Sequence, residues 1–306
     1  MTSRPLISVI TPYLDVAPYL AEAIESVLAQ SVSDWELILV DDGSQDGSSE
    51  IARAYAARHP GRIVAIEHAG HANLGSSASR NAGRQVARGE WIAYLDADDV
   101  WYPNKLALQM AIAQTHPEVG LMMGASLYWH GWRGRAEDAA RDEVILVGAP
   151  PETVYEPPRL LELLYPLGPG AAPSMNGVLV RTRLLDAVGG WEDRFRSGYD
   201  DQALLTKLYL CTKAFVSSHV FDRYRQRPGS ICASELRGGG YHEARLRFLE
   251  WLEARLAGAG MPNARIAALL REALRPYRHP LRDRTIRFGR RVTRGLRDRI
   301  VRMVAS

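Results

Sequence analysis

Segments typical of strands and of helices alternate through the first half of this chain, and this pattern constrains the fold more than any other feature. Short runs rich in Val, Ile and Leu, typical of buried strands, occupy residues 6–11, 35–40, 63–67 and 91–95. Residues 17–30, 47–58 and 77–88 lie between these runs and are predicted to form helices, the first with an apolar stripe. Strands that alternate with helices of this length predict an α/β fold, in which helices flank a mostly parallel central sheet.

The rest of the chain is less regular. Residues 130–175 are rich in Gly and Pro and are predicted to form loops over a site, with a short helix near 160–164. A strand is expected at 176–180, and helices are expected at 182–188, 200–210, 241–257 and 263–274. The last two helices are predicted to lie outside the sheet. We therefore expect an α/β domain over residues 1–235 and a helical, Arg-rich C-terminal extension over residues 236–306.

The cysteine content and the hydropathy bear on where the protein works. The two cysteines, Cys211 and Cys232, have no zinc-ligand spacing and make no disulfide framework, which suits a reducing compartment. No run of residues reaches the ~18 apolar positions that a membrane-spanning helix needs. We therefore expect a cytoplasmic protein.

The net charge of +3 conceals an uneven distribution. From residue 271 to the end there are twelve arginines and three acids, a net charge of +9 that leaves −6 for residues 1–270. Residues 286–304 have apolar side chains mostly at spacings of three or four, which predicts a basic amphipathic helix. Such a helix could lie peripherally on an anionic membrane surface or pack its apolar face on the body of the protein. Nucleic acid is not expected as a partner, because the body is acidic and carries no recognised binding motif.

Acidic residues follow two of the predicted strands. Asp41 and Asp42 follow the second strand, and Asp96 and Asp98 follow the fourth. Ligands of parallel sheets bind beyond the carboxyl ends of the strands, where such acids can hold a divalent cation that binds a diphosphate. A carboxylate after the second strand could also accept the imino N–H of a uracil or thymine ring. Turn and helix-capping roles are the ordinary alternative, and each cluster taken alone favours them.

Arg80 and the pair Asp200 and Asp201 are the other candidates for chemistry. Arg80 lies in a stretch of small residues, where its guanidinium could meet a phosphate or pair with an aspartate. Asp200 and Asp201 begin a predicted helix, so they are either caps or include a general base. The chain has no phosphate-binding loop of the Gly-x-x-x-x-Gly-Lys-Ser/Thr type, so any nucleotide is held mainly by acids, arginine and metal.

These segments, in this order, resemble the successive motifs of the family 2 glycosyltransferases. The matching segments are LISVITPY (6–13), VDDGS (40–44), SRNAG (79–83), GEWIAYLDADD (89–99) and the pair Asp200 and Asp201. The resemblance covers roughly residues 5–230 and implies the GT-A fold. It also outweighs the capping interpretation of the cluster at 96–99.

The resemblance implies roles for the nucleotide-side residues. Pro12, Tyr13 and Asp41, with Asp42 beside them, would border the base, and Asp41 would accept its ring N–H. Arg80 would lie near the nucleotide diphosphate. Asp96 and Asp98 stand at the family's Asp-x-Asp motif. Asp98 would ligate Mg²⁺ or Mn²⁺, and Asp96 would contact the ribose or the water shell of the metal.

The resemblance also implies how the acceptor side works. Asp201 aligns with the family's general base, and Asp200 stands where the family has Glu. Arg227, in YRQRPGS (224–230), occupies a position that is usually His, and it could pair with the diphosphate but cannot ligate a metal. The implied reaction is an in-line displacement with inversion at the anomeric carbon. It would move a sugar from a nucleoside-diphosphate sugar, with uridine favoured, to a glycan or lipid-linked acceptor in cell-surface polysaccharide or glycoconjugate synthesis.

Two other classes of function stay open at this point. A nucleotidyltransferase that makes sugar nucleotides also uses a nucleotide-binding α/β sheet, but it would need a Gly-rich, basic first loop, and this chain has Pro-Tyr-Leu-Asp after Thr11. A catalytically inactive module that binds nucleotide sugars is the other alternative. The retained Asp96, Asp98 and Asp201 argue against it.

Overall fold

The computed structural model describes residues 4–196, 198–227, 240–258 and 263–280. The chain divides into two compact units, one that ends at Tyr241 and one that begins at His242. The predicted boundary after residue 235 lies outside the described residues.

The N-terminal half of the sheet is parallel, as the alternating pattern predicts. Its strands are β1 (Ile7–Tyr13), β2 (Trp35–Asp41), β3 (Ile63–Glu67) and β4 (Trp91–Tyr94), in the order β3-β2-β1-β4. Every pairing among these four strands is parallel. The connecting helices are α1 (Ala17–Leu28), α2 (Ser48–Arg58) and α3 (Ser76–Val86). The α/β fold with flanking helices is therefore confirmed.

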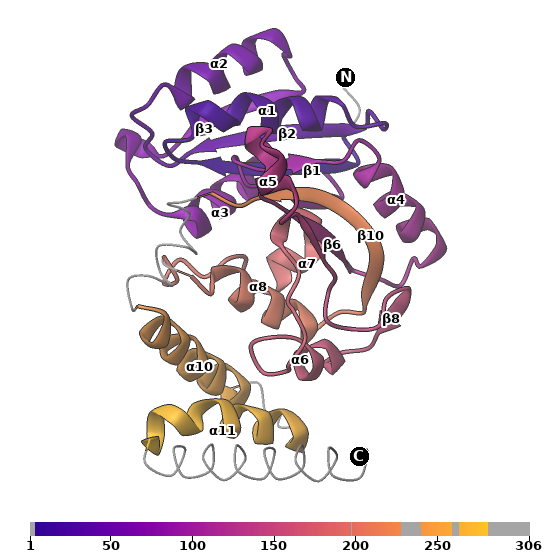
Figure 1. Cartoon of the computed structure of the whole chain (residues 1–306), viewed down its shortest axis with the longest axis vertical. Coiled ribbons are helices and arrows are strands. Elements are labelled where there is room, and N and C mark those ends of the chain that lie inside the picture. The colour runs from indigo at the N-terminus through magenta and orange to yellow at the C-terminus, as the bar shows by residue number, and fades with distance from the viewer. Residues whose placement is uncertain (1–3, 197, 228–239, 259–262, 281–306) are drawn as a thin grey trace. The chain divides into compact units, whose positions relative to one another are not determined.

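Beyond β4 the sheet is mixed and continues in the order β9-β6-β10-β5. These strands are β5 (Val100–Trp101), β6 (Leu121–Trp129), β9 (Leu179–Arg181) and β10 (Ala214–Arg225), and the short β7 (Glu143–Ile145) and β8 (Thr153–Tyr155) pair with β6 and β10. β6 and β10 pair in parallel, whereas β9 is antiparallel to both β4 and β6. β10 is interrupted by two register shifts and curves along the sheet (Figure 1).

The sequence pattern does not predict β6 or β10. β6 contains no β-branched residue, and polar residues interrupt the apolar run of β10, so neither segment has the local signal of a buried strand. The strand expected at 176–180 is also wrong in its first part. Residues Met175–Gly177 form a 3₁₀ turn that the Ser174 hydroxyl caps by accepting from Asn176 N at 3.2 Å, and β9 begins only at Leu179.

The remaining helices in the described part of the first unit are α4 (Lys105–Thr115), α5 (Ala136–Ala139), α6 (Arg159–Leu163), α7 (Thr182–Ala187) and α8 (Asp200–Tyr209). The predicted short helix near 160–164 is thus confirmed as α6. Two more 3₁₀ turns lie at Ala69–His71 and Gly131–Arg133.

Packing around the first strand explains two local features. Leu20, Ile24 and Val27 form the apolar stripe of α1 and are buried in the core, as their spacing predicts. Gly89 lies so close to β1 that a Cβ atom there would come within 2.4 Å of the Ser8 backbone nitrogen. Only glycine fits at this approach of two backbones.

Helices α10 (Tyr241–Gly258) and α11 (Ala264–Arg278) make up most of the described part of the C-terminal extension. Arg278 holds them together by donating to both carboxylate oxygens of Glu253, at 2.8 and 2.5 Å. The amphipathic segment predicted at 286–304 lies outside the described residues. Within the described ranges, no helix combines the length and the apolar character needed to cross a membrane.

Candidate active site

The predicted acids gather at one edge of the sheet. β1, β2 and β4 are parallel, so Tyr13, Asp41 and the residues that follow Tyr94 all emerge at the carboxyl ends of neighbouring strands. This is the edge at which ligands bind in parallel α/β sheets. Local strand signals in the sequence were sufficient to predict this grouping.

Asp41 is buried and organises the turn after β2. Its carboxylate accepts from the backbone nitrogens of Gly43 at 3.1 Å and Ser44 at 2.8 Å, and from the Ser49 hydroxyl. Burial opposes ionisation, but the hydrogen bonds from Ser49 and Ser44 hold the pKa of Asp41 below its ordinary value. Tyr13 lies opposite Asp41 in the register of β1 and β2, and burial beside this carboxylate raises the pKa of Tyr13. A base N–H would be an additional donor to a carboxylate that is already ionised and fixed.

Asp42 fixes a second loop over the same turn. It accepts from the backbone nitrogens of Leu74 at 2.8 Å and Gly75 at 2.9 Å. Gly43 has φ +92° and lies against this loop, since a Cβ at Gly43 would come within 2.9 Å of the His71 carbonyl oxygen. The resemblance implies that Asp42 lies beside the base, and this stays a prediction. In the structure its carboxylate holds the backbone of residues 74 and 75.

Arg80 joins the two acidic motifs of the chain. Its guanidinium donates to Asp96 at 2.8 Å and to Asp200 at 2.9 Å, and it stacks over the Trp191 ring at 4.3 Å. The Arg80 side chain is only 8% exposed, and Asp200 also accepts from the Ser76 hydroxyl at 2.9 Å. The sequence left open whether Arg80 meets a phosphate or an aspartate. It contacts two aspartates, which lie 104 positions apart in the chain.

Two arginines of the β10 end hold Asp98. Arg227 Nε donates to Asp98 Oδ2 at 2.5 Å, and Arg225 Nε donates to the Asp98 carbonyl oxygen at 2.6 Å. Arg225 is buried and also donates to Glu22 at 2.6 Å. The predicted pairing of Arg227 with a diphosphate stays a prediction; in the structure its partner is Asp98.

Asp201 is the second residue of α8 and follows Asp200. Its carboxylate accepts from the backbone nitrogen of Gln202 at 2.6 Å and from the Gln202 side chain at 3.3 Å. Burial, followed by the charge of Asp200, raises the pKa of Asp201 to about 7. A carboxylate with a pKa near neutrality can be ionised and still basic enough to take a proton.

Asn176 is a site residue that the sequence analysis missed. It is fully buried, its Oδ1 accepts from Asp96 N at 2.8 Å, and its Nδ2 donates to Asp99 Oδ2 at 2.6 Å. Asp99, also fully buried, accepts from Arg225 N at 2.7 Å. Asn176 therefore sets the turn that carries Asp96 and Asp98. No sequence signal marks this role, because it depends on a contact 80 residues away.

A group of possible metal ligands that the sequence analysis did not consider lies at the end of β3. Asp41, Glu67 and His71 each offer an atom within 4.8 Å of the others. However, His71 contacts the Ser44 carbonyl oxygen at 2.8 Å and Glu67 at 3.2 Å, one through each ring nitrogen. Two acceptors favour the imidazolium form, and the backbone contact with Ser44 raises the pKa of His71. These contacts suit a protonated His71 that stabilises the turn better than they suit a metal ligand.

The divalent cation that the sequence predicts fits the donor chemistry at Asp96 and Asp98. Carboxylate oxygens are the hard ligands that Mg²⁺ and Mn²⁺ prefer. The side chains of Asp96 and Asp98 are 30% and 19% exposed, so both can be reached from solvent. Each also has an arginine partner, Arg80 or Arg227, which a cation would have to share or displace.

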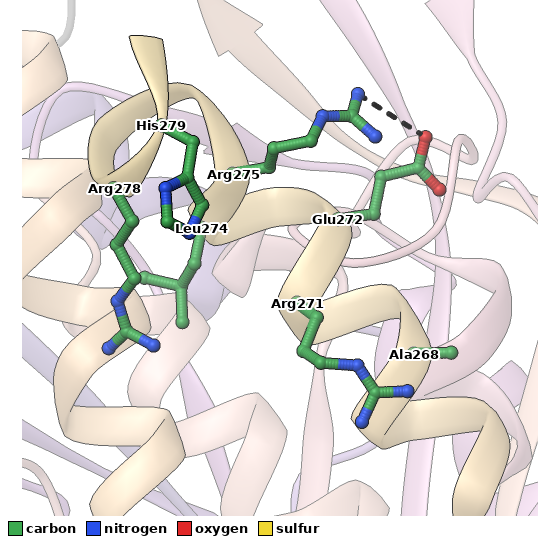
Figure 2. A pocket seen from close by; sticks show the side chains of 7 residues that line it. All are labelled: Ala268, Arg271, Glu272, Leu274, Arg275, Arg278 and His279. Carbon is green, nitrogen blue, oxygen red and sulfur yellow. Dashed lines mark ion pairs between the residues drawn. The ribbon is translucent and has the colours of Figure 1, made fainter. Parts of the chain in front are cut away.

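A separate hollow of about 500 Å³ lies on α11 in the C-terminal extension (Figure 2). It is lined by Ala268, Arg271, Glu272, Leu274, Arg275, Arg278 and His279. Arg275 and Glu272 form a loose ion pair at 3.9 Å. The hollow shares no residue with the acidic cluster at the sheet edge.

Comparison with solved structures identifies the fold as GT-A. TarS of S. aureus in complex with UDP-GlcNAc superposes with a TM-score of 0.62 at 20% identity, over 88% of this chain and 71% of that chain. The mannosyltransferase PcManGT from Pyrobaculum calidifontis, in complex with GDP-Man and Mn²⁺, has a TM-score of 0.56 at 21% identity, over 89% of this chain and 70% of that chain.

A family model matches the first part of the sequence. Residues 8–138 match the model described as Glycosyl transferase family 2. An uncharacterized glycosyltransferase of Nostoc sp., alr2836, is 45% identical over 116 residues, which are 38% of this chain and 35% of the relative. An uncharacterized protein of Sinorhizobium fredii, y4gI, is 31% identical over 267 residues, which are 86% of this chain and 27% of the relative. The chain thus matches well under half the length of these relatives.

Proposed function

We propose that this protein is a metal-dependent, inverting glycosyltransferase that moves a sugar from a nucleoside-diphosphate sugar to a hydroxyl group of an acceptor. The observation that carries the proposal is the position of Arg80 between Asp96 and Asp200. This bridge brings the motif expected to hold the donor and the helix start expected to hold the base into one site. A nucleotide-binding module without catalysis would not need Asp201 beside that bridge.

On the donor side, Asp98 would hold Mg²⁺ or Mn²⁺, and Asp96 would contact the ribose or the water shell of the ion. The bound cation would stabilise negative charge on the leaving diphosphate. Pro12, Tyr13, Asp41 and Asp42 would border the base. We favour uridine, since TarS was crystallised with UDP and with UDP-GlcNAc, although PcManGT was crystallised with GDP-Man.

On the acceptor side, Asp201 would be the general base. It would take the proton of the acceptor hydroxyl as that oxygen attacks the anomeric carbon from the face opposite the diphosphate, so the configuration inverts. Asp200 would act differently, since it pairs with Arg80 and keeps the guanidinium at the centre of the site. Arg80 and Arg227 would stabilise the charge that builds up on the leaving group.

The acceptor we propose is a glycan or a lipid-linked sugar in the synthesis of a cell-surface polysaccharide or glycoconjugate. A relative named for teichuronic acid biosynthesis, TuaG of Bacillus subtilis, is 38% identical over 108 residues. A lipid-linked acceptor would suit a cytoplasmic enzyme held peripherally at an anionic membrane surface by its basic tail. Packing of the tail on the body is the competing possibility. Binding of the full chain and of a chain ending at residue 274 to anionic vesicles distinguishes the two.

A donor screen tests the proposed function. The protein is incubated with Mn²⁺ and each of a set of nucleotide sugars, and thermal shift reports which donors bind. Chromatography of the products then separates the reaction classes. A glycosyltransferase releases a nucleoside diphosphate, a nucleotidyltransferase releases or consumes pyrophosphate, and a binding module releases neither. Pyrophosphate turnover would contradict the proposal, as would donor binding without any diphosphate release across a panel of glycan acceptors.

A further inference from the structure

The ion pair between Arg227 and Asp98 has a consequence for metal binding. We infer that Arg227 is an exchangeable counter-ion, which competes with the divalent cation for Asp98 and moves to the diphosphate when the nucleotide binds. Arg227 Nε lies 2.5 Å from Asp98 Oδ2. That oxygen belongs to the carboxylate proposed as the metal ligand, so the inference rests on the proposed function.

The surroundings of Arg227 allow it to leave its aspartate partner, whereas those of Arg80 hold it in place. Arg80 is 8% exposed, is held by two carboxylates and lies over the Trp191 ring. Arg227 is 23% exposed, and among the described residues its only acidic partner is Asp98. Its guanidinium also lies 5.4 Å from the centre of the Tyr19 ring.

Removing Arg227 from Asp98 leaves the turn itself supported. Arg225 holds the Asp98 carbonyl oxygen, and Asn176 holds the backbone nitrogen of Asp96. The Arg227 contact therefore acts on the charge of the carboxylate and contributes little to the path of the chain. A guanidinium at this oxygen neutralises it and repels a divalent cation that approaches the same atom.

The diphosphate of the nucleotide is the group that would bind the Arg227 guanidinium after it leaves Asp98. An arginine binds a phosphate group through paired, charge-assisted hydrogen bonds, so a diphosphate held beside Asp98 can take over Arg227. Arg227 thus opposes the cation when the cation binds alone and favours the nucleotide once the cation is in place. Its removal should have opposite effects on the two ligands, which a purely structural residue would not produce.

The test uses the full chain and measures each ligand separately. Electron paramagnetic resonance follows free Mn²⁺ in titrations without nucleotide, and calorimetry measures UDP affinity at saturating Mn²⁺. In R227Q we expect Mn²⁺ to bind about tenfold more tightly and UDP about tenfold more weakly, as for the loss of one partly buried charge pair. R227K keeps the charge and should lie between the wild type and R227Q.

A neighbouring arginine supplies the matched control. Arg223 lies on β10, four residues before Arg227, and its guanidinium stacks over Tyr102 at 5.1 Å and Trp129 at 5.4 Å. R223Q removes a similar positive charge at a different place, so both affinities should stay within about twofold of the wild type. An equal change in R223Q would mean that general charge, and not the Asp98 contact, sets Mn²⁺ affinity, which would overturn the inference.

The remaining outcomes separate this inference from the proposed function. If D98N abolishes Mn²⁺ binding but R227Q leaves it unchanged or weakens it, the counter-ion role is wrong and the metal role of Asp98 stands. If R227Q weakens both ligands and lowers the melting temperature, Arg227 is a structural contact and the inference is overturned. If D98N binds Mn²⁺ as the wild type does, the proposed metal site itself is wrong.

Discussion

Replacing Asp201 with Asn tests the proposed general base and its pH dependence together. Burial and the charge of Asp200 raise the pKa of Asp201 to about 7. Only the carboxylate form can accept a proton, so kcat/KM should rise with pH up to this value and level off above it. Relative to the plateau, about half of the rate should remain at pH 7 and about a tenth at pH 6.

The magnitude for D201N follows from the contacts of the side chain. General base catalysis typically contributes about 10²- to 10⁴-fold, so D201N should lower kcat by that factor. Asp201 accepts only from Gln202 among the hydrogen bonds of the described residues, and Arg80 is held by its neighbour Asp200. UDP affinity at saturating Mn²⁺ should therefore change by less than about twofold, because Arg80 keeps its ion pair with Asp200.

The assay measures UDP release between pH 5 and 9 for the wild type, D201N and D200N, with calorimetry for UDP binding. The acidic limb should disappear in D201N. In D200N it should move to lower pH, because the neighbouring charge that raises the pKa of Asp201 is gone. A D201N variant that keeps normal turnover, or one whose residual rate keeps the limb near pH 7, would refute the assignment of Asp201 as the base.

Three further substitutions test other parts of the structure. D98N should abolish Mn²⁺-dependent nucleotide binding, and unchanged calorimetric affinity in Mn²⁺ would contradict the metal role. N176A leaves the buried Asp99 carboxylate and the Asp96 N–H each without one hydrogen-bond partner. The free energy of unfolding in urea should therefore fall by about 1–3 kcal/mol, and Mn²⁺ should bind more weakly. Normal Mn²⁺ affinity in N176A would refute its positioning role. G89A forces a Cβ to within 2.4 Å of Ser8 N, so it should lower the free energy of unfolding by about 1–3 kcal/mol in the same assay. An unfolding free energy equal to that of the wild type would contradict the close approach.

The sequence by itself determined the parallel half of the sheet and the edge at which the acids lie. Hydrophobic periodicity is a local property, and β1 to β4 with α1 to α3 follow it closely. The carboxyl ends of adjacent parallel strands meet at one edge, so the sequence alone predicts that Asp41 and Asp96 lie there. The motif order then identified the family that the sequence comparison supports.

Only the tertiary structure decided which side chains meet. Arg80 pairs with Asp200 across 120 residues, and Asn176 reaches Asp99 across 77. β6 and β10 lack a clear local strand signal and are held by pairing with distant segments. Local propensity cannot predict such contacts, because the free energy that fixes them comes from burial and from the pairing of charges that the whole fold brings together. Arg80, which pairs with Asp96, and Arg227, which pairs with Asp98, can be distinguished only by their burial and their partners in the structure.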